Sequence, residues 1–355
     1  MNRGHHDSST QGVPHMSVTI ARKITVALCG AFIAAGAAGC AGGASADGKE
    51  VTTLRYQTSA GLLNYAELAD ALGYLDGLEL KTVGDVQGGP AALQALVTDQ
   101  TDFASGPFQG ATAKVASTGV EITAVAASYG STDEVNSSLL TLSDSGITNG
   151  RDLIGKKVAV NTLGANAEAV LDTYLAKEGL SSDEIEKVAL VPLPGINAEP
   201  ALRQGQVDAI YSGFAAKKVA LDHGGIEVLA NDIDFVGPYN GGSLVLTDEF
   251  IEDNPATTKT FVNGVTKAIA WDQAHTPAET LEVYTKYLEE EGRGASVKAF
   301  ETWEGNGVAT PGGVLRDQDF SIWIDWLKAS GELEAASLKP SDLYTNEFNV
   351  NAEVK

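Results

Sequence analysis

Short strand-like runs alternate with helical runs in two successive series, and this alternation limits the fold more than any other feature of the chain. In the first series the runs Thr53–Gln57 and Ile122–Ala127 enclose helical stretches, and Val158–Asn161 and Ile226–Leu229 do so in the second. Strands that alternate with helices predict βαβ units and mainly parallel sheets. Because single hydrophobic cores stop growing well below 355 residues, we expect two α/β lobes.

The two series match in detail where a helix ends and the next strand begins. Leu96–Ala104 (LVTDQTDFA) is similar to Leu202–Ile210 (LRQGQVDAI), with an aspartate that turns the chain before each strand. Each strand then leads into a loop of small and aromatic residues, Ser105–Gln109 and Tyr211–Phe214. Two similar lobes that present similar loops predict a clamp around a cleft. From Thr247 onward the pattern is helical almost throughout.

The beginning of the chain predicts an export signal. Arg22 and Lys23 precede Ile24–Ala38, an apolar run that is too short for a comfortable membrane span and ends in small residues. The ending Ala37–Cys40 (AAGC) resembles a bacterial lipobox, which implies cleavage before Cys40 and a diacylglycerol on its thiol. We therefore expect an extracytoplasmic protein that is anchored to the cell membrane by a lipid on Cys40.

This interpretation divides the start of the chain. Residues 1–39 are the predicted signal peptide of lipoprotein type, and residues 40–50 are a flexible tether between lipid and fold. A two-chain acyl anchor holds a protein stably at a bilayer without a spanning helix. The sequence leaves open whether translation starts at Met1 or at Met16.

Charge and cysteine content exclude several partners and chemistries. The net charge of -23 opposes binding to nucleic-acid phosphates and to anionic lipid surfaces. Cys29 lies in the predicted signal and Cys40 at its end, so the exported chain has no cysteine nucleophile, cysteine metal site or disulfide. His223 and His275 have no triad or metal partner nearby in the sequence. We expect no enzyme activity, no catalytic residue, no metal and no cofactor.

Motifs of one family follow one another along the predicted lobes. They are LRYQ at Leu54–Gln57, GGPAAL at Gly88–Leu93, DFASG at Asp102–Gly106, DSGI at Asp144–Ile147 and DLIGKKVAV at Asp152–Val160. In this order, and behind a lipobox, they resemble the substrate-binding proteins of ABC importers for aliphatic sulfonates, taurine, nitrate and thiamine precursors. DLIGKKVAV is the most specific of these stretches.

The resemblance implies an α/β fold of the periplasmic-binding-protein-like type II, with two lobes joined by two hinge strands. Lobe 1 would hold residues 51–136 and 248–355, and lobe 2, residues 137–247, would be inserted in it. The hinge strands would be Ser138–Leu142 and Gly242–Leu246. Such a protein, expected here as a monomer, closes on a small-molecule ligand and delivers it to the permease subunits of an ABC importer in the membrane.

Candidate ligand-binding residues lie in the loops that follow the predicted strands. In open α/β sheets a ligand lies beyond the carboxyl ends of the strands, where helices begin with backbone N–H groups that lack an internal partner. From the first lobe the candidates are Gln57, Thr58, Ser59, Leu62, Gly88, Gly89, Ser105, Pro107, Phe108, Gln109 and Tyr129. From the second lobe they are Thr162, Leu163, Ala165, Asn166, Asn197, Tyr211, Ser212 and Phe214.

The type of ligand stays open at this point. These loops contain no Arg or Lys, so a small organic anion such as a sulfonate, taurine or nitrate would be held by helix ends and hydroxyls. The aromatic candidates could instead stack on a thiamine-precursor pyrimidine or on an aromatic carboxylate such as phthalate. Thr162 and Asn166 also suit N-caps, and aromatic residues at strand ends often pack in the core, so each taken alone fits a structural role.

Two other functional classes also stay open. A sensing lipoprotein without a permease would have the same sequence features. An enzyme on the same fold is disfavoured, because the related pyrimidine-precursor synthase carries a cysteine-rich motif and an active-site histidine that this chain lacks.

Overall fold

The predicted alternation of strands and helices is present in the computed structural model, which describes residues 49–352 apart from residues 60, 87 and 334–337. The predicted signal peptide, the anchor at Cys40 and nearly all of the predicted tether lie outside the described residues. Within the described part of the chain, no helix combines the length and the apolar character needed to cross a membrane.

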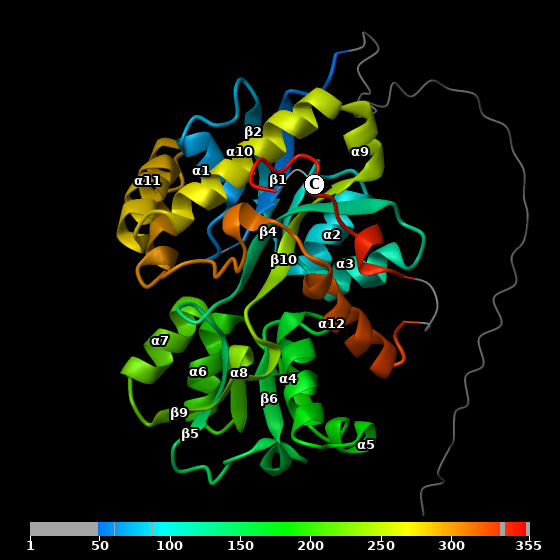
Figure 1. The fold of residues 1–355 in the computed structure, drawn as a ribbon. Helices are drawn as coiled ribbons and strands as arrows, with labels where there is room; N and C mark the ends of the chain where they lie inside the picture. Colours follow the sequence, from blue (N-terminus) through cyan, green and yellow to red (C-terminus); the bar gives the residue numbers. More distant parts are fainter. Residues whose placement is uncertain (1–48, 60, 87, 334–337, 353–355) are drawn as a thin grey trace, which may run out of the picture. The chain divides into compact units, whose positions relative to one another are not determined.

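One sheet of five strands lies wholly within residues 138–231, a region that we call the insert. Its order is β7-β6-β8-β5-β9; β6 is parallel to β7 and β8, and β5 is antiparallel to β8 and β9. The green elements of Figure 1 show helices on both faces of this sheet. The strands are β5 (Ser138–Leu142), β6 (Lys157–Val160), β7 (Ala189–Pro192), β8 (Ala209–Ser212) and β9 (Ile226–Asn231). The helices are α4 (Asn166–Lys177), α5 (Ser182–Ile185), α6 (Gly195–Arg203), α7 (Phe214–Asp222) and the short turn η1 (Gly150–Leu153).

Successive residues of the insert's strands point to opposite faces of the sheet and so build two separate cores. Leu139 joins Leu171 in the core beneath α4, whereas its neighbour Leu140 joins Leu202 in the core beneath α6. All four side chains are at most 1% exposed. Complete burial of such a side chain stabilises a fold by about 1.5–3 kcal/mol, so both faces of the sheet contribute.

The rest of the described fold, residues 51–131 and 239–352, is built on two smaller sheets, and we call it the frame. β1 and β2 are parallel, and β10 lies between β3 and β4 and is antiparallel to both. The strands are β1 (Thr53–Thr58), β2 (Glu79–Asp85), β3 (Ala104–Phe108), β4 (Ile122–Ser131) and β10 (Tyr239–Thr247). The helices are α1 (Tyr65–Ala71), α2 (Gly89–Val97), α3 (Gln109–Ala116), α9 (Asp248–Asp253), α10 (Pro255–Gln273), α11 (Pro277–Glu290) and α12 (Asp317–Ala329). Short 3₁₀ turns are η2 (Gly294–Phe300), η3 (Pro311–Gly313) and η4 (Pro340–Asp342).

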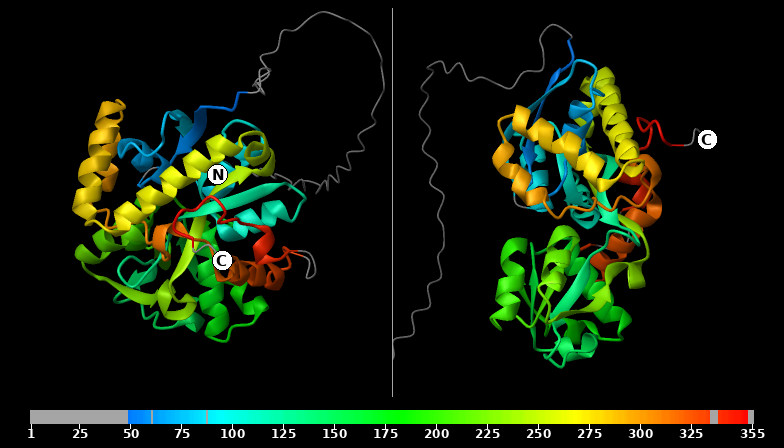
Figure 2. Two further views of the ribbon diagram at one scale, coloured as in Figure 1. Left: turned by 45° about the horizontal axis from the view of Figure 1, so that its top comes forward. Right: turned by 90° about the vertical axis from the view of Figure 1, so that its left-hand side faces the viewer.

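The long helix α10 covers the frame with one apolar face. Phe261, Val265 and Ile269 recur at the helical spacing, and all are buried. Figure 2 shows the yellow α10 beside the blue α1 segment from two further sides, in agreement with the contacts between these helices. The next helix begins at a capping box in which Thr276 and Glu279 satisfy each other's backbone N–H groups.

The sheets are less parallel than the sequence predicted. The two strands expected to act as hinges correspond to β5 and β10, and each is an antiparallel strand paired within its own sheet. The chain passes between frame and insert through residues 132–137 and 232–238, the second of which contains α8 (Asp232–Val236). β10 falls in the range predicted for lobe 2, but its partners β3 and β4 come from the range predicted for lobe 1.

Helix α12 contacts both regions of the fold. It packs against α3 of the frame and α4 of the insert. Its Trp323 is fully buried against Phe108, with ring centroids 5.0 Å apart. Its Trp326 donates a hydrogen bond from Nε1 to Oδ2 of Asp172 on α4, at 2.9 Å. The C-terminal part of the chain thus joins the frame to the insert.

Candidate functional site

A cavity of about 510 Å³ lies at the carboxyl ends of strands from both the frame and the insert. Many of the residues predicted from the sequence line it: Ser59, Leu62, Gly89, Ser105, Phe108, Tyr129, Thr162, Ala165, Asn166, Tyr211 and Ser212. Only Ser59, Leu62, Thr162 and Ala165 lie in loops, after β1 and β6. Gly89 and Asn166 begin α2 and α4, and the others, predicted as loop residues, lie within β3, β4 and β8. The position near the carboxyl ends of β1, β6 and β8 agrees with the rule for open α/β sheets. The cavity therefore has the position expected of a ligand site.

The other predicted residues lie outside the cavity lining. Thr58 is buried and its hydroxyl bonds to the carboxylate of Asp85, whereas Gln109 is fully buried and its amide nitrogen donates to Ser243 Oγ at 2.7 Å. Leu163 is 50% exposed. Pro107 is buried in β3, Asn197 is exposed on α6, and Gln57 is half-buried at the end of β1. The side chain of Phe214 lies outside the described residues.

Several lining residues were not predicted, and most of them are glycines or small residues next to predicted ones. They are Gly61, Val86, Gly106, Gly130, Ser131, Ser137, Asn161, Ala167, Pro194, Gly195, Gly213 and Ala216, whereas Gly88, also in the lining, was predicted. A Cβ on Gly88 would lie 2.8 Å from the hydroxyl oxygen of Thr162, so frame and insert approach closely there. Glycines directly after predicted strands are the sequence signal that could have found this part of the site.

Helices begin at the cavity without side-chain caps. The N-cap residues of α2, α3, α4, α6 and α7 all line the cavity, and none makes a side-chain cap hydrogen bond: Gly88, Phe108, Ala165, Pro194 and Gly213. Among the helices that begin elsewhere, α1, α9 and α11 are capped by Asn64, Thr247 and Thr276, whereas α8 and α10 also lack a side-chain cap. Uncapped helix starts present free N–H groups and the positive end of the helix dipole. Each of these helix starts therefore contributes positive potential to the cavity.

A buried carboxylate lies behind one wall of the cavity. Asp232 is 1% exposed, and its Oδ2 accepts hydrogen bonds from Ser131 Oγ at 2.6 Å, Tyr239 at 3.2 Å and Tyr211 at 3.3 Å. Burial raises the pKa of Asp232 above its usual value. Burial also raises the pKa values of Tyr211 and Tyr239 well above normal, so both hydroxyls stay protonated. Asn166, at the start of α4, donates from Nδ2 to both tyrosine oxygens.

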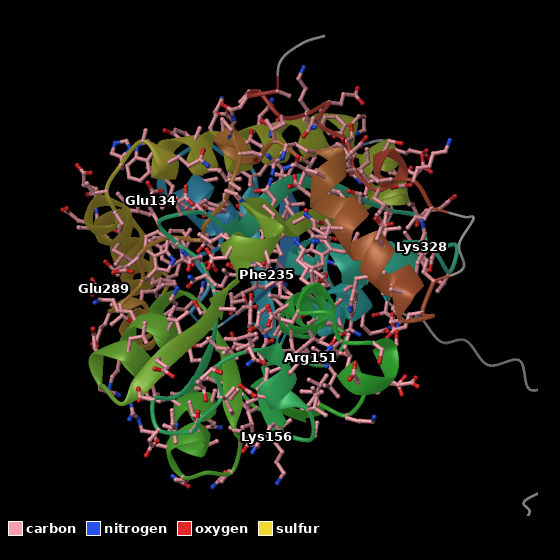
Figure 3. All side chains as sticks on the ribbon, turned by 60° about the horizontal axis from the view of Figure 1, so that its bottom comes forward. Glu134, Arg151, Lys156, Phe235, Glu289 and Lys328 are labelled. Carbon is pink, nitrogen blue, oxygen red and sulfur yellow. The ribbon has the colours of Figure 1, made fainter. Side chains whose placement is uncertain are left out.

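None of the described residues that line the cavity has a formally charged side chain. The exposed Arg151 and the half-buried Lys156 lie on the outside of the insert, as Figure 3 shows. The half-buried Lys217 on α7 lies closer, but its ammonium group donates to the side chains of Asn136 and Asn231, and burial lowers its pKa. Among the residues that the structure describes, no three His, Cys, Asp or Glu side chains converge in a way that could hold a metal ion. The cavity therefore offers backbone and side-chain dipoles, hydroxyls and rings.

Comparison with solved structures defines the fold. The alkanesulfonate-binding protein SsuA of Xanthomonas axonopodis pv. citri bound to MOPS is 19% identical, with a TM-score of 0.62 over 84% of this chain and 100% of that chain. The nitrate-binding protein NrtA of Synechocystis PCC 6803 is 13% identical, with a TM-score of 0.64 over 84% of this chain and 87% of that chain. A third structure is a conserved gene product of Candida albicans, described as having the generic periplasmic binding protein fold. It is 18% identical, with a TM-score of 0.60 over 83% of this chain and 96% of that chain. The predicted fold class is confirmed.

Sequence comparison defines the family. No curated protein matches the chain. The model of the family described as NMT1/THI5 like matches residues 67–279, which is more than half of the chain and spans most of the cavity lining. This match confirms the resemblance identified from the motifs, and the chain belongs to the NMT1/THI5-like family.

Proposed function

We propose that this protein is the solute-binding subunit of an ABC-type importer, held outside the cytoplasm, and that it captures a small organic anion of the sulfonate, taurine or nitrate kind. The convergence of five uncapped helix N-termini on one cavity carries the proposal. Such N-termini bind anions without a cationic side chain. A volume of about 510 Å³ falls within the range usual for small-molecule sites.

The mechanism follows from a ligand that contacts frame and insert together. Such a ligand has a higher affinity for a closed arrangement than for an open one, and it shifts the population toward closure. In this proposal the frame and the insert act as the two lobes, and residues 132–137 and 232–238 let them move. The closed form then docks on the permease. In this proposal the protein binds its solute without converting it; the described lining residues include no His, Cys, Lys, Asp or Glu.

An aromatic solute is the second candidate. The rings of Tyr129 and Tyr211 line the cavity, so a pyrimidine or an aromatic carboxylate could stack there. Phe108 contributes less than the sequence suggested, because it is 1% exposed and packs against Trp323 and Trp326. A sensing role without a permease would use the same cavity.

The lipid anchor belongs to the same proposal. Replacement of the anchor residue, Cys40→Ser, should release the protein from the membrane fraction into the soluble extracytoplasmic fraction. Retention of the variant in the membrane would contradict the anchor.

The binding proposal is tested by thermal shift with the purified full-length chain and a panel of sulfonates, nitrate, pyrimidines and aromatic carboxylates. A solute at about 100 times its Kd adds about 2.7 kcal/mol of stability. Thr162→Ala should weaken binding but shift the unliganded melting temperature little, because its hydroxyl lies at the cavity. Failure of every anion in the panel, or conversion of a bound compound, would refute the proposal.

A further inference from the structure

Frame and insert meet at the cavity away from the two connections between them, residues 132–137 and 232–238, which we call the crossovers. Gly88 precedes α2 of the frame, Thr162 follows β6 of the insert, and both line the cavity. A Cβ on Gly88 would lie 2.8 Å from Thr162 Oγ1 and 3.6 Å from Thr162 Cβ. The hydroxyl is the nearer group, so the side chain of Thr162 points toward the backbone of Gly88.

Only glycine at residue 88 permits this close approach. Gly88 has φ 82° and ψ 160°, a conformation that is essentially restricted to glycine. The space that a side chain would occupy there is already filled by Thr162. The distance between frame and insert at this point therefore depends on the absence of a side chain at residue 88.

Each side of the contact is held by its own part of the fold. In the frame, the next residue, Gly89, packs so closely that a Cβ would lie 2.9 Å from the Cα of Pro107. In the insert, the backbone N–H of Gly164 donates to the carboxylate of Glu168 at 2.7 Å, which ties the loop after β6 to the first turn of α4. A movement of the frame against the insert therefore changes the distance across the contact before it deforms either loop.

The crossovers are fastened to each other at a different part of the cavity lining. Ser131, directly before the first crossover, and Ser137, its last residue, both line the cavity. Asp232 begins the second crossover; its Oδ2 lies 2.6 Å from Ser131 Oγ, and its Oδ1 accepts from the backbone N–H of Ser137 at 3.3 Å. Frame and insert can turn about this fastened pair, and they separate where Gly88 meets Thr162.

We propose, resting on the proposed function, that the contact between Gly88 and Thr162 is the gate of the cavity. A solute enters and leaves only while this contact is open, and the absence of a side chain at residue 88 lets the gate close fully. The structure describes the gate in its closed position. Since a solute that contacts frame and insert favours the closed arrangement, the same contact controls how fast the solute is released.

A pair of cysteines tests whether the two loops meet in this way. The Cβ positions of residues 88 and 162 lie 3.6 Å apart, and disulfides join Cβ atoms that are about 3.5–4.5 Å apart. The test variant is Gly88→Cys with Thr162→Cys in the full-length chain, whose own Cys29 and Cys40 are changed to serine. Oxidised glutathione takes up two electrons and two protons from the pair and is released as two thiols. We expect the pair to form the disulfide nearly completely.

The matched control is Gly88→Cys with Gly164→Cys. It keeps the unfavourable backbone at residue 88, but nothing lies within 4 Å of a Cβ at Gly164, so we expect little disulfide. Intact-protein mass spectrometry separates the products, since the disulfide removes two hydrogen atoms whereas a glutathione adduct adds mass. A disulfide yield in the test pair no higher than in the control pair overturns the gate.

Ethanesulfonate and nitrate then serve as probes of passage through the gate. In calorimetric titration, the pair oxidised without a probe should bind at least about tenfold more weakly than the same protein after reduction, because apparent affinity falls with the fraction of molecules that can bind. The pair oxidised with a probe bound should retain it through gel filtration and release it on reduction. The strain at residue 88 is common to both redox states. Uptake and release that oxidation leaves unchanged overturn the gate.

A second test leaves Gly88 as it is. Thr162→Val and Thr162→Ile both lack the hydroxyl, and they differ from each other by one methylene group. Extra volume in a close contact is unfavourable, so the isoleucine variant should bind the probes at least about fivefold more weakly than the valine variant. Equal affinities of the two variants overturn the gate.

The proposed function fails by a different result. If neither probe binds the parent chain, a sulfonate-type or nitrate-type function is overturned. The disulfide yield still decides on the gate in that case: a yield above that of the control pair supports it, and a yield at the control level overturns it.

Discussion

Asp172 should make the fold less stable as the pH rises from about 4 to about 6. This residue lies on α4, partly buried beneath α12, and accepts the hydrogen bond from Trp326. Burial raises the pKa of its carboxyl to about 6, and the nearby negative charges of Glu168 and Glu332 act in the same direction. The Trp326 hydrogen bond opposes this shift but does not cancel it.

The sign and the size of the effect follow from the two pKa values. The unfolded chain has an aspartate pKa of about 3.9, so between about pH 4 and pH 6 the folded protein holds a proton that the unfolded chain has released. Stability therefore falls through this window and stays lower above it. Each pKa unit corresponds to about 1.4 kcal/mol, which gives about 3 kcal/mol at neutral pH.

Asp172→Asn tests this reasoning because the amide oxygen can still accept the Trp326 hydrogen bond while the charge is lost. We expect the variant to be more stable than the parent by up to about 3 kcal/mol at about pH 7.5, and nearly equal at about pH 4. Thermal unfolding followed by circular dichroism at both pH values measures the difference. Asp325→Asn, exposed on α12, is the control. A variant that is destabilised at pH 7.5, or shifted equally at both pH values, would refute the reasoning.

Two further perturbations address the site and the core. Gly89→Ala would place a Cβ 2.9 Å from the backbone of Pro107; we expect a loss of about 1–3 kcal/mol in thermal unfolding, whereas Gly195→Ala, with open space at its Cβ, should be tolerated. Equal melting temperatures for both variants would contradict this. Glu67→Gln removes the buried counter-charge of Arg293 and should lower stability to urea by about 1–3 kcal/mol, and an unchanged urea midpoint would show that the pair contributes little.

Local sequence patterns predict individual elements well but not their partners. The predicted runs Thr53–Gln57 and Ile226–Leu229 begin where β1 and β9 begin, because a short apolar run is a local signal. The antiparallel position of β10 between β3 and β4 could not be predicted in this way. Its pairing partners lie far away along the chain, and a strand's own pattern does not specify which strand it pairs with.

The site shows the same division between local and remote signals. Thr162 and Asn166 lie at the cavity because they follow a strand and begin a helix, which the sequence shows directly. Thr58 and Gln109 look equivalent in the sequence, yet remote partners, Asp85 and Ser243, satisfy them in the interior. Asp232 was not predicted as part of the site, because it follows β9, where the sequence offers no other candidate. Only the fold brings the Tyr211 hydroxyl within hydrogen-bond distance of its carboxylate.

The five-stranded sheet and the three-stranded sheet β3-β10-β4 draw their strands from the chain differently, and this sets an order of assembly. All strands of the five-stranded sheet come from one continuous segment, so a chain that emerges N-terminus first can complete that sheet early. β3 and β4 must instead wait for β10, which is made after the whole insert. During this interval their unpaired edges are open to aggregation, so a chaperone would protect the nascent chain most between synthesis of β4 and arrival of β10.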